Sequence, residues 1–306
     1  MMKKHAIGID IGGTKIAIGL IDETGTIVAQ SVIKTMPKDV TPETKIAEVV
    51  IEVKQLLTKN NVEEKQLTGI GIGAPGPLNT KEGTLTEPPN LRTWWGAPVR
   101  KWIEEAFNCP VVIENDANAA TLAEKWLGAA KECEHFVFMT ISTGVGAGIY
   151  SHGRLLTGAY GNAGEIGHVV IDPAYGTSAC GQKGTLEWIA SGTGIARQAQ
   201  ALTGKSMTAE EVFKESNNGN EELKELVNTV YEKIGVGCVT LINLLEPEKI
   251  ILGGGVTKVG EPLFAGVKAY VEKYAISSAG RKIEIVPAGL NQDAGLLGAA
   301  ALILQK

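Results

Sequence analysis

The chain has 306 residues, of which 44% are hydrophobic and 21% charged, a composition typical of a folded globular protein. Its formal net charge of -5 and its scattered lysines exclude the clustered positive surface that nucleic-acid binding requires. No segment approaches the roughly 18 apolar residues of a membrane span. Asp10 interrupts the apolar amino-terminal segment too early for a signal peptide. We therefore expect a cytoplasmic protein with no nucleic-acid or membrane partner.

The length and the cysteines add two further expectations. A chain of 306 residues exceeds the size at which one core usually stops growing, so two domains with a cleft between them are expected. The four cysteines (Cys109, Cys133, Cys180 and Cys238) lie far apart without a CxxC pair, which favours reduced thiols over a disulfide framework.

A β-meander is predicted at the start of the chain. Three segments rich in Ile and Val run from His5 to Ile33, separated by a glycine turn and by a second turn at 22–25. A helix is expected over 41–60, followed by a buried strand at 69–73. A loop rich in Pro, Gly and Thr follows, and another strand begins at Pro110.

The same plan returns in the second half of the chain. A strand at 135–141, a glycine turn and a strand at 147–150 repeat the opening pattern, which we interpret as an internal duplication. Strands that alternate with helices make the class α/β. We expect a first domain of residues 1–118 plus 293–306, and a second domain of residues 119–292 with a loop-rich insert at 156–190.

The first glycine turn carries a phosphate-binding pattern. Asp10 ends a strand and is followed by Gly12, Gly13, Thr14 and Lys15. Glycines let backbone N–H groups face an anion, Thr adds a donor, and Asp can hold Mg²⁺ through water. A plain hairpin turn is the alternative interpretation.

Two later glycine clusters repeat this chemistry. Ser142 to Gly148 contains Thr143, Gly144 and Gly146 at the matching point of the second half. A third cluster, with Gly254 and Gly255, follows a strand and precedes an expected helix at 261–274, which suits nucleotide contact near a helix amino terminus. Neither hairpin is a P-loop or a dinucleotide motif. A tight strand-to-helix connection is the alternative for the third cluster.

The catalytic candidate lies in the segment ENDAN at 114–118. Helix capping needs one polar residue, yet four polar side chains occupy five positions at the carboxyl end of a strand, where α/β proteins bind ligands. A carboxylate at Asp116 can accept the proton of an attacking hydroxyl, and Asn115 can bind neighbouring hydroxyls. Glu165, His168 and Glu187 are further groups that can read the hydroxyls of a sugar, although a lone His is more often structural.

With these residues in place, the chain resembles the ROK family of sugar kinases, which includes bacterial glucokinases. The resemblance covers essentially the whole chain, on DIGGTK at 10–15, GIGAPGP at 71–77, PNL at 89–91, ENDANAA at 114–120, TGVGAGI at 143–149, GEIGH at 164–168 and LGGG at 252–255. It implies a two-domain actin-like ATPase fold, a duplicated ribonuclease H-like unit with a central cleft. It also implies ATP and Mg²⁺ as cofactors, closure of the domains over the substrate and a homodimer.

The resemblance also implies roles for individual residues. Asp116 is expected to be the catalytic base, and Asp10 to bind Mg²⁺ through water. Sugar contacts are expected from Gly76, Asn90, Asn115, Asp116, Glu165, His168 and Glu187. ATP contacts are expected from Asp10, Gly12, Gly13, Thr14, Lys15, Thr143, Gly144, Gly146, Gly254 and Gly255.

One feature departs from the family pattern. Family members usually hold a structural zinc ion with the His of GEIGH and three cysteines of a CGCGxxGCxE run. Here that run reads Ser178-Ala-Cys180-Gly-Gln-Lys-Gly-Thr185-Leu-Glu187, so only His168 and Cys180 remain. We therefore predict that structural zinc is absent.

The substrate and the functional class leave alternatives open. Glucose, converted to glucose 6-phosphate in glycolysis, is the first choice, and N-acetylmannosamine, fructose and β-glucosides are alternatives that share these motifs. A sugar-sensing regulator would need a helix-turn-helix segment of many tens of residues, and only nine residues precede Asp10. A non-catalytic sugar-binding protein is the third possibility. The candidate base and the two phosphate-binding turns favour an enzyme.

Overall fold

The computed structural model describes residues 4–35, 40–178, 180–290 and 293–305. It divides into two compact units, the first made of Met1–Lys131, Leu155–Ala163 and Gln292–Lys306, and the second of Glu132–Arg154 and Gly164–Asn291. The boundary expected after Asn118 falls instead after Lys131. The reason is that helix α3 (Asp116–Trp126) packs on helix α9 (Ala294–Leu304), both in the first unit. Asn291 and Gln292, at the second expected boundary, lie outside the described residues.

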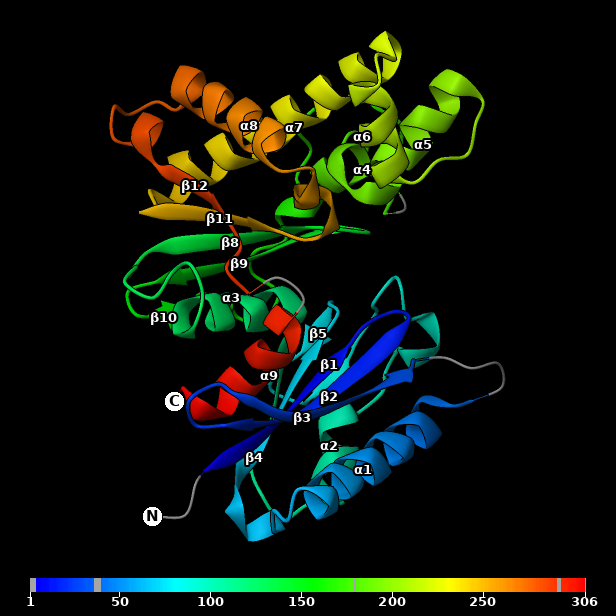
Figure 1. Ribbon diagram of the computed structural model, residues 1–306, viewed down its shortest axis with the longest axis vertical. Helices are drawn as coiled ribbons and strands as arrows, with labels where there is room; N and C mark the ends of the chain where they lie inside the picture. The colour runs from blue at the N-terminus through cyan, green and yellow to red at the C-terminus, as the bar shows by residue number, and fades with distance from the viewer. Residues whose placement is uncertain (1–3, 36–39, 179, 291–292, 306) are drawn as a thin grey trace. The chain divides into compact units, whose positions relative to one another are not determined.

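The first unit is built on a five-stranded sheet of order β3-β2-β1-β4-β7 (Figure 1). The predicted meander is present, since β1, β2 and β3 pair antiparallel, whereas β4 and β7 run parallel to β1. The strands are β1 (His5–Ile11), β2 (Lys15–Asp22), β3 (Ile27–Lys34), β4 (Leu67–Ala74) and β7 (Val111–Asn115).

Alternating residues give this sheet two different faces. Ile7, Ile9, Ile70 and Ile72 are fully or almost fully buried in one apolar cluster with helix α1 (Pro42–Lys59). The intervening positions on β1 and β4 are mostly glycine, and they face α9. A Cβ atom added at Gly8 would lie 2.5 Å from the carbonyl oxygen of Leu296, so the helix backbone packs directly on the strands. One face of the sheet therefore buries apolar side chains against α1, and the other packs closely against the backbone of α9.

Short elements connect the strands of the first unit. The segment 74–90, expected as a loop, contains a two-stranded hairpin, and Trp94 after it is fully buried in the core. The connecting elements are η1 (Glu64–Gln66), β5 (Leu78–Asn79), β6 (Thr84–Leu85), η2 (Arg92–Trp94) and α2 (Val99–Glu104).

The second unit repeats the sheet topology of the first, with order β10-β9-β8-β11-β12. Strands β8 and β9 pair antiparallel, and β11 and β12 follow as parallel strands, which supports the predicted duplication. The strands are β8 (Phe136–Ile141), β9 (Val145–Ser151), β10 (Arg154–Leu155), β11 (Lys249–Gly253) and β12 (Glu284–Pro287). The helices are η3 (Ile166–His168), α4 (Leu186–Ala190), α5 (Gly192–Thr203), α6 (Ala209–Asn217), α7 (Glu221–Leu245), η4 (Gly255–Val259), α8 (Glu261–Tyr274) and η5 (Gly280–Lys282).

In the second unit, helix α6 and strand β12 were not predicted from the sequence, and the expected insert was too long. Helix α6 has a capping box between Thr208 and Glu211, a local signal that could have identified it. Strand β12 is only four residues long. The insert expected at 156–190 is split, because residues 155–163 belong to the first unit and α4 ends the segment. None of the helices in the described ranges has the length and apolar character needed to cross a membrane.

Candidate functional site

The carboxyl ends of the parallel strands in the first unit bring the expected catalytic residues together. Asp10 of β1 is paired in register with Gly73 of β4, and Gly73 with Glu114 of β7. A Cβ atom at Gly73 would lie 3.9 Å from both the Asp10 Oδ1 atom and the Asp116 Cα atom. The Asp10 carboxylate and the backbone of Asp116 therefore both border the same side-chain-free position, at the edge where α/β sheets bind ligands.

Asp10 also lies against the start of helix α9. A Cβ atom at Gly295, in the first turn of this helix, would be 2.4 Å from the Asp10 Oδ2 atom. Burial raises the pKa of the Asp10 carboxyl group, and the nearby Lys15 charge opposes this shift. A bound cation would likewise favour the ionised form. Asp10 is thus a suitable oxygen ligand for a metal ion. Its carboxylate occupies the space that a side chain at residue 295 would fill.

The first glycine turn lies near one of the expected sugar contacts. The N–H group of Gly12 donates to the carbonyl oxygen of Lys15 (2.9 Å), so this donor is engaged within the hairpin. The Cβ atom of Asn90 lies 3.8 Å from the position of a Cβ atom at Gly13. The structure therefore places Asn90, expected to bind sugar, beside the turn expected to bind phosphate.

Residues 115 and 116 have separate roles at the start of helix α3. Asn115 is the N-cap, and its Oδ1 atom accepts hydrogen bonds from the N–H groups of Ala117 (2.9 Å) and Asn118 (3.2 Å). Asp116 is the first helical residue and is exposed, and its Oδ1 atom accepts from the Ala117 N–H group. The capping interpretation thus holds for Asn115, while the carboxylate of Asp116 is accessible to a ligand.

Glu114 supports this turn from within the core. It is 7% exposed, and its Oε1 atom accepts from the Asn115 N–H group (2.8 Å) and from the Asn118 Nδ2 atom (3.0 Å). Burial raises the pKa of Glu114, and these two hydrogen bonds oppose the shift. The Oδ1 atom of the fully buried Asn118 has no hydrogen-bond partner within the described part of the chain.

We expect Glu114→Gln to stabilise the protein at neutral pH by about 1 kcal/mol, the value of one added buried hydrogen bond. A glutamine keeps the acceptor oxygen and adds an NH₂ group that can donate to Asn118 Oδ1. Because the pKa of Glu114 is raised in the fold, ionisation costs stability as pH rises through that pKa. The gain should therefore disappear below about pH 4, where the carboxyl group is protonated in both folded and unfolded chains. Thermal unfolding from pH 4 to 8 tests this, and a variant less stable than wild type at pH 8 would contradict it.

Gly76 lies in a loop that two distant segments form together. It follows β4 and precedes a cis peptide bond to Pro77, immediately before β5. Asn162, from the returning segment 155–163, accepts from the Leu78 N–H group (3.1 Å) and donates to the Leu78 carbonyl oxygen (3.2 Å). The sequence places Asn162 in a segment, 159–162, expected to discriminate between sugars, but it does not indicate this contact between residues so far apart.

In the second unit, the cluster with Gly254 and Gly255 packs against the glycine turn between β8 and β9. Gly254 has φ 91°, and a Cβ atom there would lie 2.3 Å from the carbonyl oxygen of Ile141. Only glycine fits this approach. A Cβ atom at Gly255 would lie 3.7 Å from the Ser142 Oγ atom. The third cluster therefore lies directly beside the second glycine turn, as expected for groups that share one ligand.

A cavity of about 710 Å³ lies at this turn. Its lining includes Ser142, Thr143, Thr193, Phe213 and Gly255. The volume is within the usual range for small-molecule sites. The amino terminus of the 12-residue helix α5 contributes Gly192 and Thr193 to the wall, which favours a negatively charged ligand group there.

Glu187 contacts the same turn. Its Oε2 atom accepts from the Val145 N–H group (2.9 Å), and a Cβ atom at Gly144 would lie 2.5 Å from this oxygen. The carboxylate expected to bind sugar is therefore also attached to the turn expected to bind phosphate. Nothing in the sequence spacing indicated this contact.

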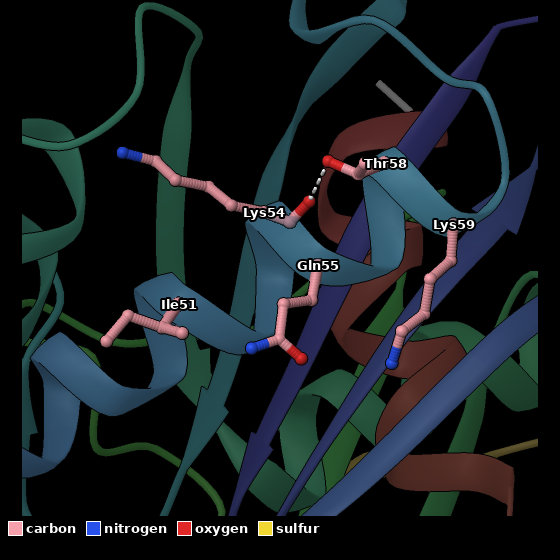
Figure 2. A pocket seen from close by; sticks show the side chains of 5 residues that line it. All are labelled: Ile51, Lys54, Gln55, Thr58 and Lys59. Carbon is pink, nitrogen blue, oxygen red and sulfur yellow. Dashed lines mark hydrogen bonds between the residues drawn. The ribbon is translucent and has the colours of Figure 1, made fainter.

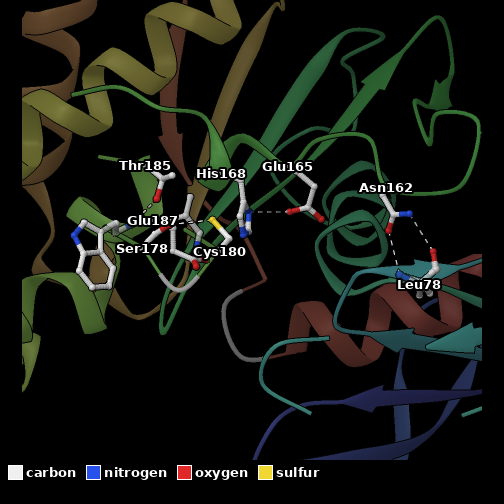
Figure 3. A network of polar contacts seen from close by, with 10 residues as sticks. Leu78, Asn162, Glu165, His168, Ser178, Cys180, Thr185 and Glu187 are labelled. Atoms are coloured by element: carbon white, nitrogen blue, oxygen red, sulfur yellow. Dashed lines mark hydrogen bonds and ion pairs between the residues drawn. The ribbon is translucent and has the colours of Figure 1, made fainter. Parts of the chain in front are cut away.

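The other expected sugar contacts of the second unit surround His168. Figure 3 shows the His168 ring facing Glu165, with 3.4 Å between His168 Nδ1 and Glu165 Oε2, and Cys180 on its other side. The Glu165 side chain is the main cause of a raised pKa for His168, and the charge of Glu187 adds to it. His168 is thus oriented by a carboxylate from its own turn.

The residues at the family's zinc position do not fit a closed metal site. The Ser178 Oγ atom lies 2.9 Å from Cys180 Sγ, and Thr185 uses its hydroxyl oxygen to cap helix α4 (Figure 3). Asp172, another possible ligand, pairs with Lys233 at 2.6 Å. Over the described ranges, no group of three or more His, Cys, Asp or Glu side chains is arranged to hold a metal ion.

A second hollow, of about 340 Å³, lies on the outer surface of helix α1 in the first unit (Figure 2). Five side chains of this one helix line it: Ile51, Lys54, Gln55, Thr58 and Lys59. None of the expected site residues contributes to it. The lining has no carboxylate and no glycine turn, so we do not assign it a ligand.

Comparison with known proteins agrees with this organisation. The model of the ROK family matches residues 6–306. A glucokinase of Thermotoga maritima is 32% identical over 100% of this chain and 99% of its own length.

Solved structures show the same fold. A ROK hexokinase from Thermus thermophilus is 32% identical, with a TM-score of 0.86 over 98% of each chain. A ROK glucokinase from Streptomyces griseus, crystallised with glucose and AMPPNP, is 30% identical, with a TM-score of 0.82 over 99% of this chain and 100% of its own. The predicted actin-like α/β fold class is confirmed. The chain belongs to the ROK family.

Proposed function

We propose that this protein is an ATP-dependent sugar kinase that converts glucose to glucose 6-phosphate. The observation that carries the proposal is that Asp10 Oδ1 and the Asp116 Cα atom both border the side-chain-free position of Gly73, at the carboxyl edge of the sheet. A carboxylate base next to a phosphate-binding turn is what hydroxyl phosphorylation requires. The named glucokinase relatives and the neighbour with glucose and AMPPNP support glucose and ATP as the substrates.

In the proposed reaction, Asp116 accepts the proton of a sugar hydroxyl while that oxygen attacks the γ-phosphorus atom of ATP. The bond from the γ-phosphorus to the bridging oxygen breaks, and ADP leaves. Asn115 holds neighbouring hydroxyls with its amide group. The other proposed sugar contacts are Gly76, Asn90, Glu165, His168 and Glu187.

Within each unit, a glycine turn is the proposed contact for ATP phosphates. In this proposal the N–H groups of Gly13, Thr143 and Gly144 bind the phosphates, whereas those of Gly12 and Val145 already donate within the protein. Gly255 lines the cavity proposed for the nucleoside, and Gly254 precedes it in the chain. Mg²⁺, when bound, would neutralise phosphate charge. Asp10 would hold it through water, since its carboxylate is fixed beside the turn and burial disfavours its charge unless a cation is near.

The test is an ADP-release assay with purified protein, Mg²⁺ and a panel of sugars compared by kcat/KM. The panel contains glucose, N-acetylmannosamine, fructose and a β-glucoside. We expect the highest kcat/KM with glucose. Sugar-dependent ADP release with a different preferred sugar would correct the substrate. Sugar binding without any ADP release would favour a regulator or a non-catalytic sugar-binding protein.

We expect the enzyme to keep its activity without zinc. Two of the four ligand positions of the family's zinc site hold hydroxyl groups, which are poor ligands for this ion, and here these hydroxyls hydrogen-bond to Cys180 and to helix α4. Elemental analysis of protein purified without added zinc should give well below one ion per chain. Activity should be unchanged after chelation and return of Mg²⁺. Stoichiometric zinc whose removal abolishes activity would contradict the prediction.

We also propose a cytoplasmic homodimer that acts in glycolysis. The free thiols of Cys109, Cys133, Cys180 and Cys238 suit a reducing compartment. Leu244 and Ile276 are 74% and 80% exposed, and the Ile276 N–H group donates to Oδ1 of Asn243, the residue that precedes Leu244. Such an apolar surface suits contact with a second copy. Light scattering of Leu244→Asp beside wild type tests this, with loss of the dimer as the expected result.

A further inference from the structure

In both glycine turns, backbone carbonyl oxygens accept hydrogen bonds from residues outside the turn. In the first turn, the Thr35 Oγ1 atom donates to the Gly12 carbonyl oxygen (2.6 Å). The Thr35 N–H group donates to the Thr14 carbonyl oxygen (3.0 Å). One residue just beyond β3 therefore fixes two peptide units of the turn.

The second turn has an equivalent arrangement made by different residues. The Thr193 Oγ1 atom donates to the Thr143 carbonyl oxygen (2.7 Å), and the Gly192 N–H group donates to the Ser142 carbonyl oxygen (2.7 Å). Thr193 lies at the start of α5, whereas Thr35 follows a strand. The same threonine-to-carbonyl contact thus recurs in both units at different points of the topology.

These contacts determine where the N–H groups of the turns point. A trans peptide unit is planar, so its N–H and C=O groups point in opposite directions. Holding the Gly12 carbonyl oxygen orients the N–H group of Gly13 the other way. Holding the carbonyl oxygens of Ser142 and Thr143 does the same for the N–H groups of Thr143 and Gly144. The oriented donors belong to residues that the proposed function assigns to ATP.

We propose that Thr35 and Thr193 are positioning residues, each of which orients the N–H groups of the glycine turn in its own unit for binding nucleotide phosphate. This inference rests on the proposed function. Each hydroxyl keeps a carbonyl oxygen, which would repel a phosphate, turned away from the ligand. Glu187 assists in the second unit by accepting from Val145 N–H.

Substitution of Thr35 tests the proposal more directly than substitution of Thr193. It is 0% exposed, so it cannot contact the nucleotide and must act through the turn. Thr193 is exposed and lines the cavity, so its substitution could also change a direct contact. Thr35→Val keeps the shape of the side chain and removes the donor, and Thr35→Ser restores the donor.

The experiment measures, by calorimetry with Mg²⁺ and without sugar, the affinity of the whole protein for adenosine, ADP and AMPPNP. We expect Thr35→Val and Thr193→Val each to weaken ADP and AMPPNP binding about five- to twentyfold. Adenosine, which has no phosphate, should bind as it does to wild type. Thr35→Ser and Thr193→Ser should recover most of the loss.

Matched controls remove a threonine-to-carbonyl bond elsewhere in each unit. Thr58 donates to the Lys54 carbonyl oxygen (2.9 Å) in α1, and Thr240 to the Val236 carbonyl oxygen (2.9 Å) in α7. Thr58→Val and Thr240→Val should leave all three affinities unchanged. Circular dichroism melting identifies any variant that fails to fold, and the serine variants and Thr193→Val then decide the result.

Three outcomes separate the possibilities. Unchanged ADP affinity in both valine variants would overturn the proposal, and so would an equal loss of adenosine and ADP affinity, which indicates a disturbed cavity. A wild-type protein that binds no adenine nucleotide would instead refute the proposed kinase function, and the positioning role with it.

Discussion

Replacing Asp116 by Asn is expected to lower kcat by about 10² to 10⁴-fold while sugar affinity stays within a few-fold. Asparagine keeps the size and the hydrogen-bonding reach of the side chain, but it cannot take the proton of the attacking hydroxyl. Asp116 is exposed at the first position of α3 beside Asp10, so the substitution leaves the core unchanged. Steady-state ADP release gives kcat, and calorimetry with glucose gives the affinity.

Glu114→Gln is the matched control for this variant. It neutralises a carboxylate two residues away that is buried and hydrogen-bonded to the same turn. We expect it to retain kcat within about threefold. If Asp116→Asn kept more than about a tenth of wild-type turnover, Asp116 would not be the base. If both variants lost turnover equally, the shape of the turn would matter more than proton transfer.

Gly71→Ala is expected to be the most destabilising small substitution in the first unit, by about 3 kcal/mol or more. A Cβ atom at this position would lie 1.7 Å from the Ala299 carbonyl oxygen. That oxygen belongs to the backbone of helix α9, which cannot move away as a flexible side chain can. The helix must shift off β4, which separates the packed layers of the core. Thermal unfolding should show a fall in Tm of roughly 6 to 12 °C.

Gly73→Ala provides the matched control on the same strand and the same face. The nearest atom to a Cβ atom there is the Ala119 Cβ at 3.6 Å, an ordinary contact. We expect this variant to unfold within about 1 kcal/mol of wild type. Equal destabilisation by both substitutions would contradict the close approach of α9 as the cause.

Much of the fold could be predicted from local patterns. Alternating Ile and Gly residues identified β1 and β4, the Thr41-Pro42 pair preceded helix α1, and the repeated glycine hairpin indicated the duplication that the two sheet orders support. These features follow from side-chain alternation, capping and turn chemistry, which act over a few residues. The boundary at Asn118 was misplaced because the packing of α3 on α9 joins segments separated by most of the chain.

The candidate site likewise has features that can be predicted from the sequence and contacts that depend on tertiary packing. The sequence by itself determined which residues carry useful chemistry. A carboxylate at a strand end or a glycine pair in a turn can be recognised from the local sequence alone. Only the tertiary structure decided which of them meet. Gly295 allows α9 to lie against Asp10, Glu187 reaches the N–H group of Val145, and Thr35 and Thr193 hold the turns. Such contacts depend on strand register and helix packing, which no sequence spacing specifies.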